Sequence, residues 1–226
     1  MTTPKALFFD VFGTCVDWRT SVIRAGEPLG LPAAYADDWR ARYQPQLETV
    51  RSGDRPWTVL DVLHREALDE VLAELGADLP AAVRDELNLV WHRLDPWPDT
   101  VPGLTRLRER FVIAPVSNGN IALLVDMARH AGLPWDAILG AELAHAYKPN
   151  PRVYLASVHA LGLEPHDVMM VAAHNGDLLA AQALGLRTAF VPRPREHGPG
   201  QVEDLAPEGD YDALAEDFLQ LSEYLL

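Results

Sequence analysis

The sequence predicts an α/β protein: a doubly wound, Rossmann-like parallel sheet with a helical cap subdomain inserted after its first strand. An apolar, strand-like run at 6–9 is followed only by helical spacing as far as residue 94. From residue 111 onward, apolar strands and amphipathic helices alternate. This alternation is typical of an open parallel sheet with helices on both faces, so the helical stretch interrupts a single sheet-forming core.

The predicted elements follow in order along the chain. Helices with apolar residues three to four apart are expected at 18–29, 33–51, 58–76 and 80–94. A proline-rich stretch at 95–103 is predicted as a stiff crossing back to the sheet. Strands then follow at 111–116, 137–140, 168–172 and 188–191, and helices at 121–131, 152–161, 178–184 and 212–225, with a surface loop at 193–210. These boundaries place 1–15 with 98–226 in the core and 16–97 in the cap.

The composition limits the partners and the cellular setting. A formal net charge of −14 argues against binding to nucleic acid or to an anionic membrane surface. The single cysteine, Cys15, excludes an internal disulfide and fits a reducing compartment. The chain opens with no signal-like segment and has no apolar run long enough to span a bilayer, so we expect a cytoplasmic protein.

Polar residues follow four of the predicted strands. They are Asp10 and Thr14 after the first strand, Ser117 and Asn118 after 111–116, Lys148 beyond 137–140, and the run from His174 to Asp177 after 168–172. Each cluster alone is typical of a turn, a helix cap or a solvated side chain. Because the carboxyl ends of parallel strands meet at one edge of a sheet, all four together predict a shared pocket.

Several motifs resemble those of the haloacid dehalogenase superfamily and, within it, the 2-haloacid dehalogenases. They are Phe9-Asp10-Val11-Phe12-Gly13-Thr14 with Asp17-Trp18, Ser117-Asn118-Gly119, and Lys148-Pro149-Asn150-Pro151-Arg152-Val153-Tyr154. With the helical insertion, the resemblance covers nearly the whole chain. It implies hydrolysis of short 2-haloalkanoic acids to 2-hydroxy acids, with an S preference, a homodimer, and no metal or other cofactor.

Two positions separate this chain from the superfamily's phosphatases. Those enzymes carry an acid two residues after the nucleophile, where this chain has Phe12, and a Mg²⁺-binding acid where it has Ala173. A halide leaves as a stable anion and needs no proton, which fits Phe12. Three alternatives remain: a Mg²⁺-dependent phosphatase for a small phosphorylated metabolite, a catalytically silent binding protein, and a hydrolase that opens a strained ring beside a carboxylate.

The expected chemistry has two steps. Asp10 attacks carbon 2 from the rear and expels halide, and water then hydrolyses the resulting ester at its carboxyl carbon. Lys148 would lower the pKa of Asp10, while the hydroxyls of Thr14 and Ser117 would bond to its oxygens. Asp177 is the candidate that orients or activates water with Lys148 as its ion-pair partner, unless the two form a purely structural pair.

The resemblance also implies contacts to the substrate and to the halide ion. Ser117, Asn118 and neighbouring backbone N–H groups would bind the substrate carboxylate. Arg40 on the second cap helix would bind halide, although Arg42 matches almost as well and either arginine could instead lie on a solvated helix face. The rest of the pocket wall is expected to come from Phe12, Trp57 and Tyr154.

The run from His174 to Asp177 departs from the family's pattern. His174 stands where relatives have an asparagine that contacts halide, and Gly176 stands where they have an aromatic residue. We expect His174 and Asn175 to contact the substrate or the halide. As an imidazolium, His174 would favour a small, hard anion such as fluoride, or it only caps the following helix.

Overall fold

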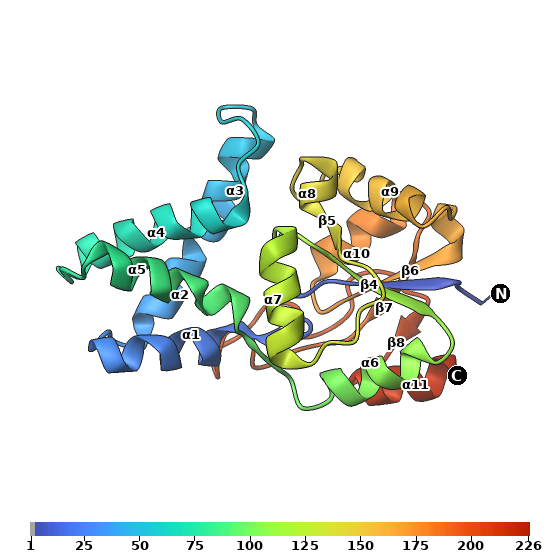
Figure 1. The fold of residues 1–226 in the computed structure, drawn as a ribbon. Coiled ribbons are helices and arrows are strands. Elements are labelled where there is room, and N and C mark those ends of the chain that lie inside the picture. The colour runs from blue at the N-terminus through green and yellow to red at the C-terminus, as the bar shows by residue number, and fades with distance from the viewer. Residues whose placement is uncertain (1–2) are drawn as a thin grey trace.

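A computed structural model describes residues 3–226, and its centre is a six-stranded parallel sheet in the order β5-β4-β1-β6-β7-β8 (Figure 1). The strands are β1 (Ala6–Phe9), β4 (Val112–Ser117), β5 (Leu139–Gly140), β6 (Val168–Ala172), β7 (Arg187–Phe190) and β8 (Ala213–Leu214). The helices that connect or follow these strands are α6 (Thr100–Arg108), α7 (Ile121–Ala131), α8 (Ala141–Ala144), α9 (Pro151–Ala160), η3 (Pro165–Asp167), α10 (Asn175–Gln182) and α11 (Phe218–Leu225). The chain runs outward from β1 to both sides, which confirms the predicted doubly wound fold.

The position of β1 determines where the strand ends meet. β1 lies between β4 and β6, and Phe9 at its end pairs with Pro115 and Val171. All of its residues are fully buried, as expected for a central strand covered on both faces. The carboxyl ends of β1, β4 and β6 therefore open at the same edge.

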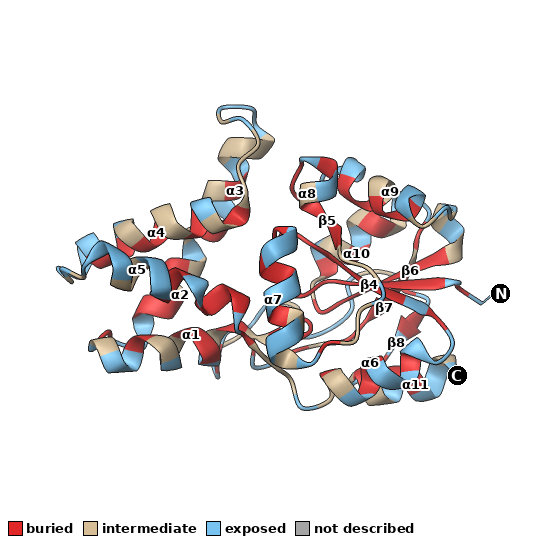
Figure 2. Ribbon diagram, in the orientation of Figure 1, coloured by how far each residue is buried: buried red, intermediate tan, exposed pale blue. Residues whose placement is uncertain are grey.

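Alternate residues of β1 face the helices that cover the two opposite faces of the sheet. Leu7 and Phe9 belong to the apolar cluster that includes α6, α7 and α11, whereas Ala6 and Phe8 belong to the cluster that includes α9 and α10. This alternation follows from the two-residue repeat of a strand. In Figure 1, α8 and α9 lie above the sheet and α6 and α11 below it, and Figure 2 shows the strands between them as buried.

A layer of helices lies beside the sheet in Figure 1. It contains α1 (Trp18–Gly26), η1 (Glu27–Leu29), α2 (Ala34–Ala41), α3 (Tyr43–Arg51), α4 (Leu60–Glu74), α5 (Ala81–Asn88) and η2 (Leu89–His92). At its two ends, β2 (Val16–Asp17) pairs antiparallel with β3 (Asp95–Pro96). Trp18, Trp39 and Trp91 from this layer share an apolar cluster with Leu7 and Phe9, so the core is continuous between helices and sheet.

Several boundaries differ from the sequence prediction. The helix expected at 33–51 is two helices, because Pro45 in the first turn of α3 has no N–H for the carbonyl of Ala41 and its ring would clash there. The crossing expected at 95–103 already contains the start of α6, since the first helical turn tolerates Pro102. The last helix begins at Phe218 because β8 occupies the preceding segment, and the short α8 was not predicted. Within residues 3–226, no helix has the length and apolar character needed to cross a bilayer.

Candidate active site

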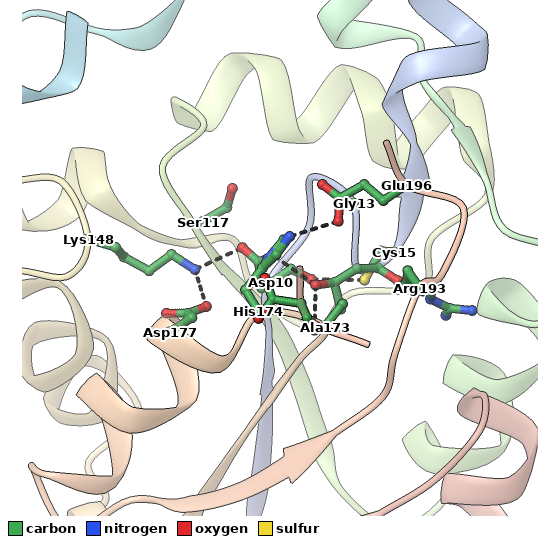
Figure 3. A network of polar contacts seen from close by, with 12 residues as sticks. Asp10, Gly13, Cys15, Ser117, Lys148, Ala173, His174, Asp177, Arg193 and Glu196 are labelled. Atoms are coloured by element: carbon green, nitrogen blue, oxygen red, sulfur yellow. Dashed lines mark hydrogen bonds and ion pairs between the residues drawn. The ribbon is translucent and has the colours of Figure 1, made fainter. Parts of the chain in front are cut away.

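Asp10 lies directly after β1, and its backbone N–H donates to the carbonyl of Val171 at 3.0 Å. Its side chain is only 9% exposed, and both carboxylate oxygens have partners. Lys148 Nζ lies 2.8 Å from Oδ1, while Thr14 Oγ1 and His174 Nδ1 lie 2.8 Å and 3.0 Å from Oδ2 (Figure 3). Segments after three different strands thus meet at one carboxylate.

Lys148 bridges Asp10 and Asp177. Its ammonium lies 2.6 Å from Asp177 Oδ2, and its backbone N–H donates to Asn118 Oδ1 at 2.8 Å. The other Asp177 oxygen accepts a hydrogen bond from the Tyr154 hydroxyl at 2.5 Å. Both oxygens of Asp177 are therefore committed to neighbouring side chains.

Burial and charge act in opposite directions on the pKa of Asp10. Burial raises it, but the charge of Lys148 and the hydrogen bond and charge of His174 outweigh burial, so the pKa lies well below its usual range. Burial lowers the pKa of Lys148, and the carboxylates of Asp10 and Asp177 raise it above its ordinary value. At neutral pH an ionised Asp10 therefore faces a charged Lys148, and the ionised carboxylate is the nucleophilic form.

His174 lies between two carboxylates. Opposite its contact with Asp10, its Nε2 is 2.8 Å from Oε2 of Glu196. Glu196 is 1% exposed, and its other oxygen accepts a hydrogen bond from Trp18 Nε1 at 3.0 Å. Burial lowers the pKa of His174, but the charge of Glu196 and the hydrogen bonds to both carboxylates raise it well above its ordinary value. The imidazole is therefore cationic while Asp10 is ionised.

The turn after Asp10 leaves room for Glu196. A Cβ atom on Gly13 would lie 2.1 Å from the Glu196 carboxylate, and the φ of Gly13 is +84°, a conformation that favours glycine. His174 occupies the N-cap position of α10 but makes no side-chain capping bond there. The capping role considered for His174 is therefore replaced by its pairing with Glu196.

Arg193 lies in the same loop after β7 as Glu196, and it holds Thr14 in place. Its Nε donates to the carbonyl of Thr14 at 2.9 Å, and its terminal nitrogens contact the two oxygens of Asp99 at 2.7 Å and 2.8 Å. The Thr14 hydroxyl accepts a hydrogen bond from the backbone N–H of Ala173 at 3.0 Å while donating to Asp10. The loop after β7 thus holds the hydroxyl that binds Asp10, a role that sequence reasoning did not find.

A cavity of about 610 Å³ opens over Asp10, between the sheet edge and the helical layer. Its wall includes most of the residues predicted at the site: Asp10, Phe12, Arg40, Asn118, Lys148, Tyr154, His174 and Asp177. Residues that were not predicted at the site also line it, among them Trp18 and Glu196.

Arg40 is the arginine that faces this cavity. Its guanidinium lies 4.1 Å from the ring centroid of Tyr43, and one terminal nitrogen is buried without a hydrogen-bond partner among residues 3–226. Arg42 does not line the cavity and contacts Glu70 at 3.3 Å and Glu74 at 2.5 Å. The structure therefore separates the two candidates, and Arg40 is the one with a free donor at the site.

Trp57 and Asn175 do not line the cavity. Trp57 packs on the rings of His145 and Tyr147, with centroids 5.5 Å and 4.8 Å apart, and so lies where the helical layer meets the core. The Asn175 amide donates to Asp204 Oδ1 at 2.9 Å and to a neighbouring carbonyl, so it holds the loop after β7. Tertiary partners from distant segments occupy both side chains, so the structure does not place them where the sequence led us to expect contact with substrate.

The side chains of Ser117 and Asn118 are also occupied within the chain. The Ser117 hydroxyl accepts from the backbone N–H of Gly119 at 3.2 Å, and across residues 3–226 it makes no hydrogen bond to Asp10. Besides its bond to Lys148, Asn118 donates to the Tyr43 hydroxyl at 2.9 Å. The sequence led us to expect a hydrogen bond from Ser117 to Asp10, and among residues 3–226 this bond is not formed.

An ionised carboxylate at the end of the first strand of a doubly wound sheet, beneath a helical layer, is the arrangement of a hydrolase that works through an aspartate. The family model for haloacid dehalogenase-like hydrolases matches residues 4–185, and the chain belongs to this family.

Several relatives and solved structures are similar along nearly their whole lengths. (S)-2-haloacid dehalogenase 1 of Pseudomonas sp. (strain CBS-3) is 30% identical over 85% of this chain and 88% of its own. (S)-2-haloacid dehalogenase 4A of Burkholderia cepacia is 28% identical over 94% of this chain and 92% of its own. The solved structures of the L-2-haloacid dehalogenase PA0810 and of the defluorinating L-2-haloacid dehalogenase Rha0230 are each 50% identical, with a TM-score of 0.96. They cover 99% and 98% of this chain and 100% and 95% of their own.

Proposed function

We propose that this protein hydrolyses short 2-haloalkanoic acids to 2-hydroxy acids through an ester on Asp10. The observation that carries this proposal is an ionised, buried Asp10 in a cavity whose wall also holds Arg40, a cation with a free donor. The names of the similar proteins support the same chemistry.

In the first step, a carboxylate oxygen of Asp10 bonds to carbon 2 while the carbon–halogen bond breaks. The halide leaves with the bonding electron pair toward Arg40, whose charge stabilises the departing anion. Because no proton is needed, the apolar Phe12 suits the position two residues after the nucleophile. The backbone N–H of Asn118 has no acceptor within residues 3–226, so it is the donor we expect for the substrate carboxylate.

In the second step, water must attack the carboxyl carbon of the ester. We assign the base to His174 rather than to Asp177, because both Asp177 oxygens are already bonded to Lys148 and Tyr154. Ester formation removes the charge of Asp10 and so lowers the pKa of His174, while Glu196 continues to raise it. The second step requires that His174 gives its proton to solvent at this stage. Neutral His174 then takes a proton from the attacking water, while Glu196 stabilises the imidazolium.

The products balance with the substrates. The ester carbon–oxygen bond breaks, the 2-hydroxy acid leaves with the proton of the tetrahedral intermediate, and Asp10 returns as a carboxylate. One halide ion and one proton are released to solvent per turnover.

The residues present do not fit a Mg²⁺ ion of the phosphatase type. Lys148 and His174, both cationic, already contact the Asp10 carboxylate, and Ala173 offers a methyl group where an acid would be needed. Among residues 3–226, no group of three or more His, Cys, Asp and Glu side chains could hold a metal ion. The chemistry derived above therefore uses only this chain's own residues.

The test is halide release from racemic 2-chloropropionate and from fluoroacetate with EDTA present. Wild type should release halide, and Asp10→Asn should release none because an amide is not a nucleophile here. Phosphate-ester cleavage that requires Mg²⁺, without halide release, would contradict the proposal.

We further propose that residues 16–97 form a cap subdomain, supported by the pairing of β2 with β3 at its two ends. A homodimer is supported by the family resemblance, and light scattering in solution tests it. A cytoplasmic location is supported by the lone, buried thiol of Cys15.

A further inference from the structure

The cavity is larger than a two- or three-carbon haloacid needs. Its volume of about 610 Å³ falls within the roughly 300–1,000 Å³ of pockets that hold drug-sized ligands. Beyond the nucleophile it extends to Gln44 in α3 and to Glu203 and Asp204 in the loop after β7. The space therefore continues outward from the reacting carbon.

Gly176 leaves one wall of this space open. It lies in the first turn of α10 between His174, which contacts Asp10, and Asp177, which contacts Lys148. A Cβ atom on Gly176 would meet no atom within 4 Å, and its helical backbone suits any side chain. The turn therefore does not require the glycine, and at this exposed point of the cavity wall no other atom fills the space that a side chain would take.

The reaction geometry leaves this direction for the substituent on carbon 2. Asp10 attacks from one side, the halide leaves toward Arg40, and the carboxylate faces the loop that carries Asn118. We propose that the substituent extends past Gly176, and that the protein accepts 2-haloacids whose substituent is neutral and several carbons long at least as well as the shortest ones. This proposal rests on the dehalogenation proposed above.

The charges of the outer cavity favour a neutral substituent. Asp37 is held by both Nε and a terminal nitrogen of Arg19 at 2.7 Å, and Asp204 accepts the backbone N–H of Asn175 at 2.8 Å. Glu203 lines the cavity as an exposed residue, and its carboxylate forms no ion pair with Lys, Arg or His among residues 3–226. A second carboxylate on the substrate would therefore meet an uncompensated negative charge.

The experiment compares kcat/KM for racemic 2-chloropropionate, 2-chlorohexanoate and 2-chlorosuccinate in wild type, Gly176→Trp and Gly176→Ala. In wild type we expect kcat/KM for 2-chlorohexanoate to equal or exceed that for 2-chloropropionate. The value for 2-chlorosuccinate should be roughly 10-fold or more below both. Gly176→Trp should lower the hexanoate-to-propionate ratio by roughly 10-fold or more, because the ring fills the space. Gly176→Ala is the matched control, since it removes the glycine but adds only one carbon, and its ratio should stay near that of wild type.

Other results would contradict the proposed substrate class, the role of Gly176 or the proposed function, as follows. Wild type that acts on 2-chloropropionate but rejects 2-chlorohexanoate overturns the substrate class while leaving dehalogenation intact. If Gly176→Trp leaves the hexanoate-to-propionate ratio unchanged, Gly176 does not determine the chain-length specificity. The same conclusion follows if Gly176→Ala lowers this ratio as much as Gly176→Trp does. Chloride release from none of the three substrates contradicts the proposed function itself.

Discussion

Replacing His174 with glutamine should separate the two chemical steps. Glutamine keeps an N–H that can donate to Asp10, but it cannot accept a proton at neutral pH. Lys148 remains 2.8 Å from Asp10, so the nucleophile stays ionised and the ester can still form. Hydrolysis of the ester loses its base.

Because glutamine keeps the donor to Asp10, what it loses is the charged contact with Glu196, at 2.8 Å, and the proton acceptor itself. A hydrogen bond to a charged group contributes about 1.5–3 kcal/mol. At roughly 1.4 kcal/mol per factor of ten, this range corresponds to about 10- to 100-fold. General-base catalysis contributes roughly 10²–10⁴, so we expect kcat to fall by at least about 100-fold.

Intact-protein mass spectrometry during turnover of 2-chloropropionate provides the assay, combined with steady-state chloride release. His174→Gln should release one chloride per site quickly and then accumulate the ester, whereas wild type should accumulate none. His166→Gln is the control, because its side chain is 71% exposed and lies outside the site, and it should behave as wild type. Slow turnover of His174→Gln without an accumulated ester would place its effect on the first step and refute the assignment of the base.

Two other changes test neighbouring features. Arg40→Gln should lower kcat/KM by roughly 10-fold or more through loss of the charge facing the halide. Arg42→Gln, which loses ion pairs with the exposed Glu70 and Glu74 away from the cavity, should stay within about two-fold. An equal effect of both would show that the guanidinium of Arg40 has no special part. Burial lowers the pKa of His92, but contacts with Asp61 at 3.0 Å and Asp126 at 2.9 Å outweigh it and raise the pKa above 6.5. Since the folded-state pKa is the higher one, this stabilisation of about 1–3 kcal/mol is complete below pH 6.5 and is lost as pH rises through the raised pKa. Urea unfolding of wild type and His92→Gln at several pH values checks this, and a difference that does not change with pH would contradict it.

The sequence was sufficient for the parts of the site that follow from strand ends. A fully apolar run before Asp10 predicts a central buried strand, and neighbouring parallel strands bring their carboxyl ends to the same edge. Local pattern and the general geometry of parallel sheets are therefore enough to expect Asp10, Asn118, Lys148 and Asp177 around one cavity, and the structure places them there.

The choice between Arg40 and Arg42 needed the tertiary structure. Residues two apart on a helix point about 160° away from each other, so only one of the two can face the cavity. Which one does so depends on where α2 ends, and that boundary is set by Pro45 and by packing against the core. The positions of Trp57 and Asn175 outside the cavity wall could not be predicted for a related reason, because nothing local in the sequence identifies their distant partners.

Glu196 could not be found because its burial depends on Trp18 and His174, which lie far from it in the chain. The loop at 193–210 is rich in proline, glycine and acids, a composition typical of the surface. Gly13 is the one related signal, yet a glycine after a strand also suits an ordinary turn. The contact that explains it appears only when the loop folds back over the sheet edge.

Two sets of residues therefore hold Asp10 in place, and only one of them lies wholly within the residues that the family model matches. Lys148 is held by Asp177 within the family-matched residues 4–185. Thr14 and His174 are held by Arg193 and Glu196, which lie beyond that match. Because the first set determines the charge of the nucleophile and the second determines the base for hydrolysis, changes in the loop after β7 would alter the second step while the motif around Asp10 stays the same.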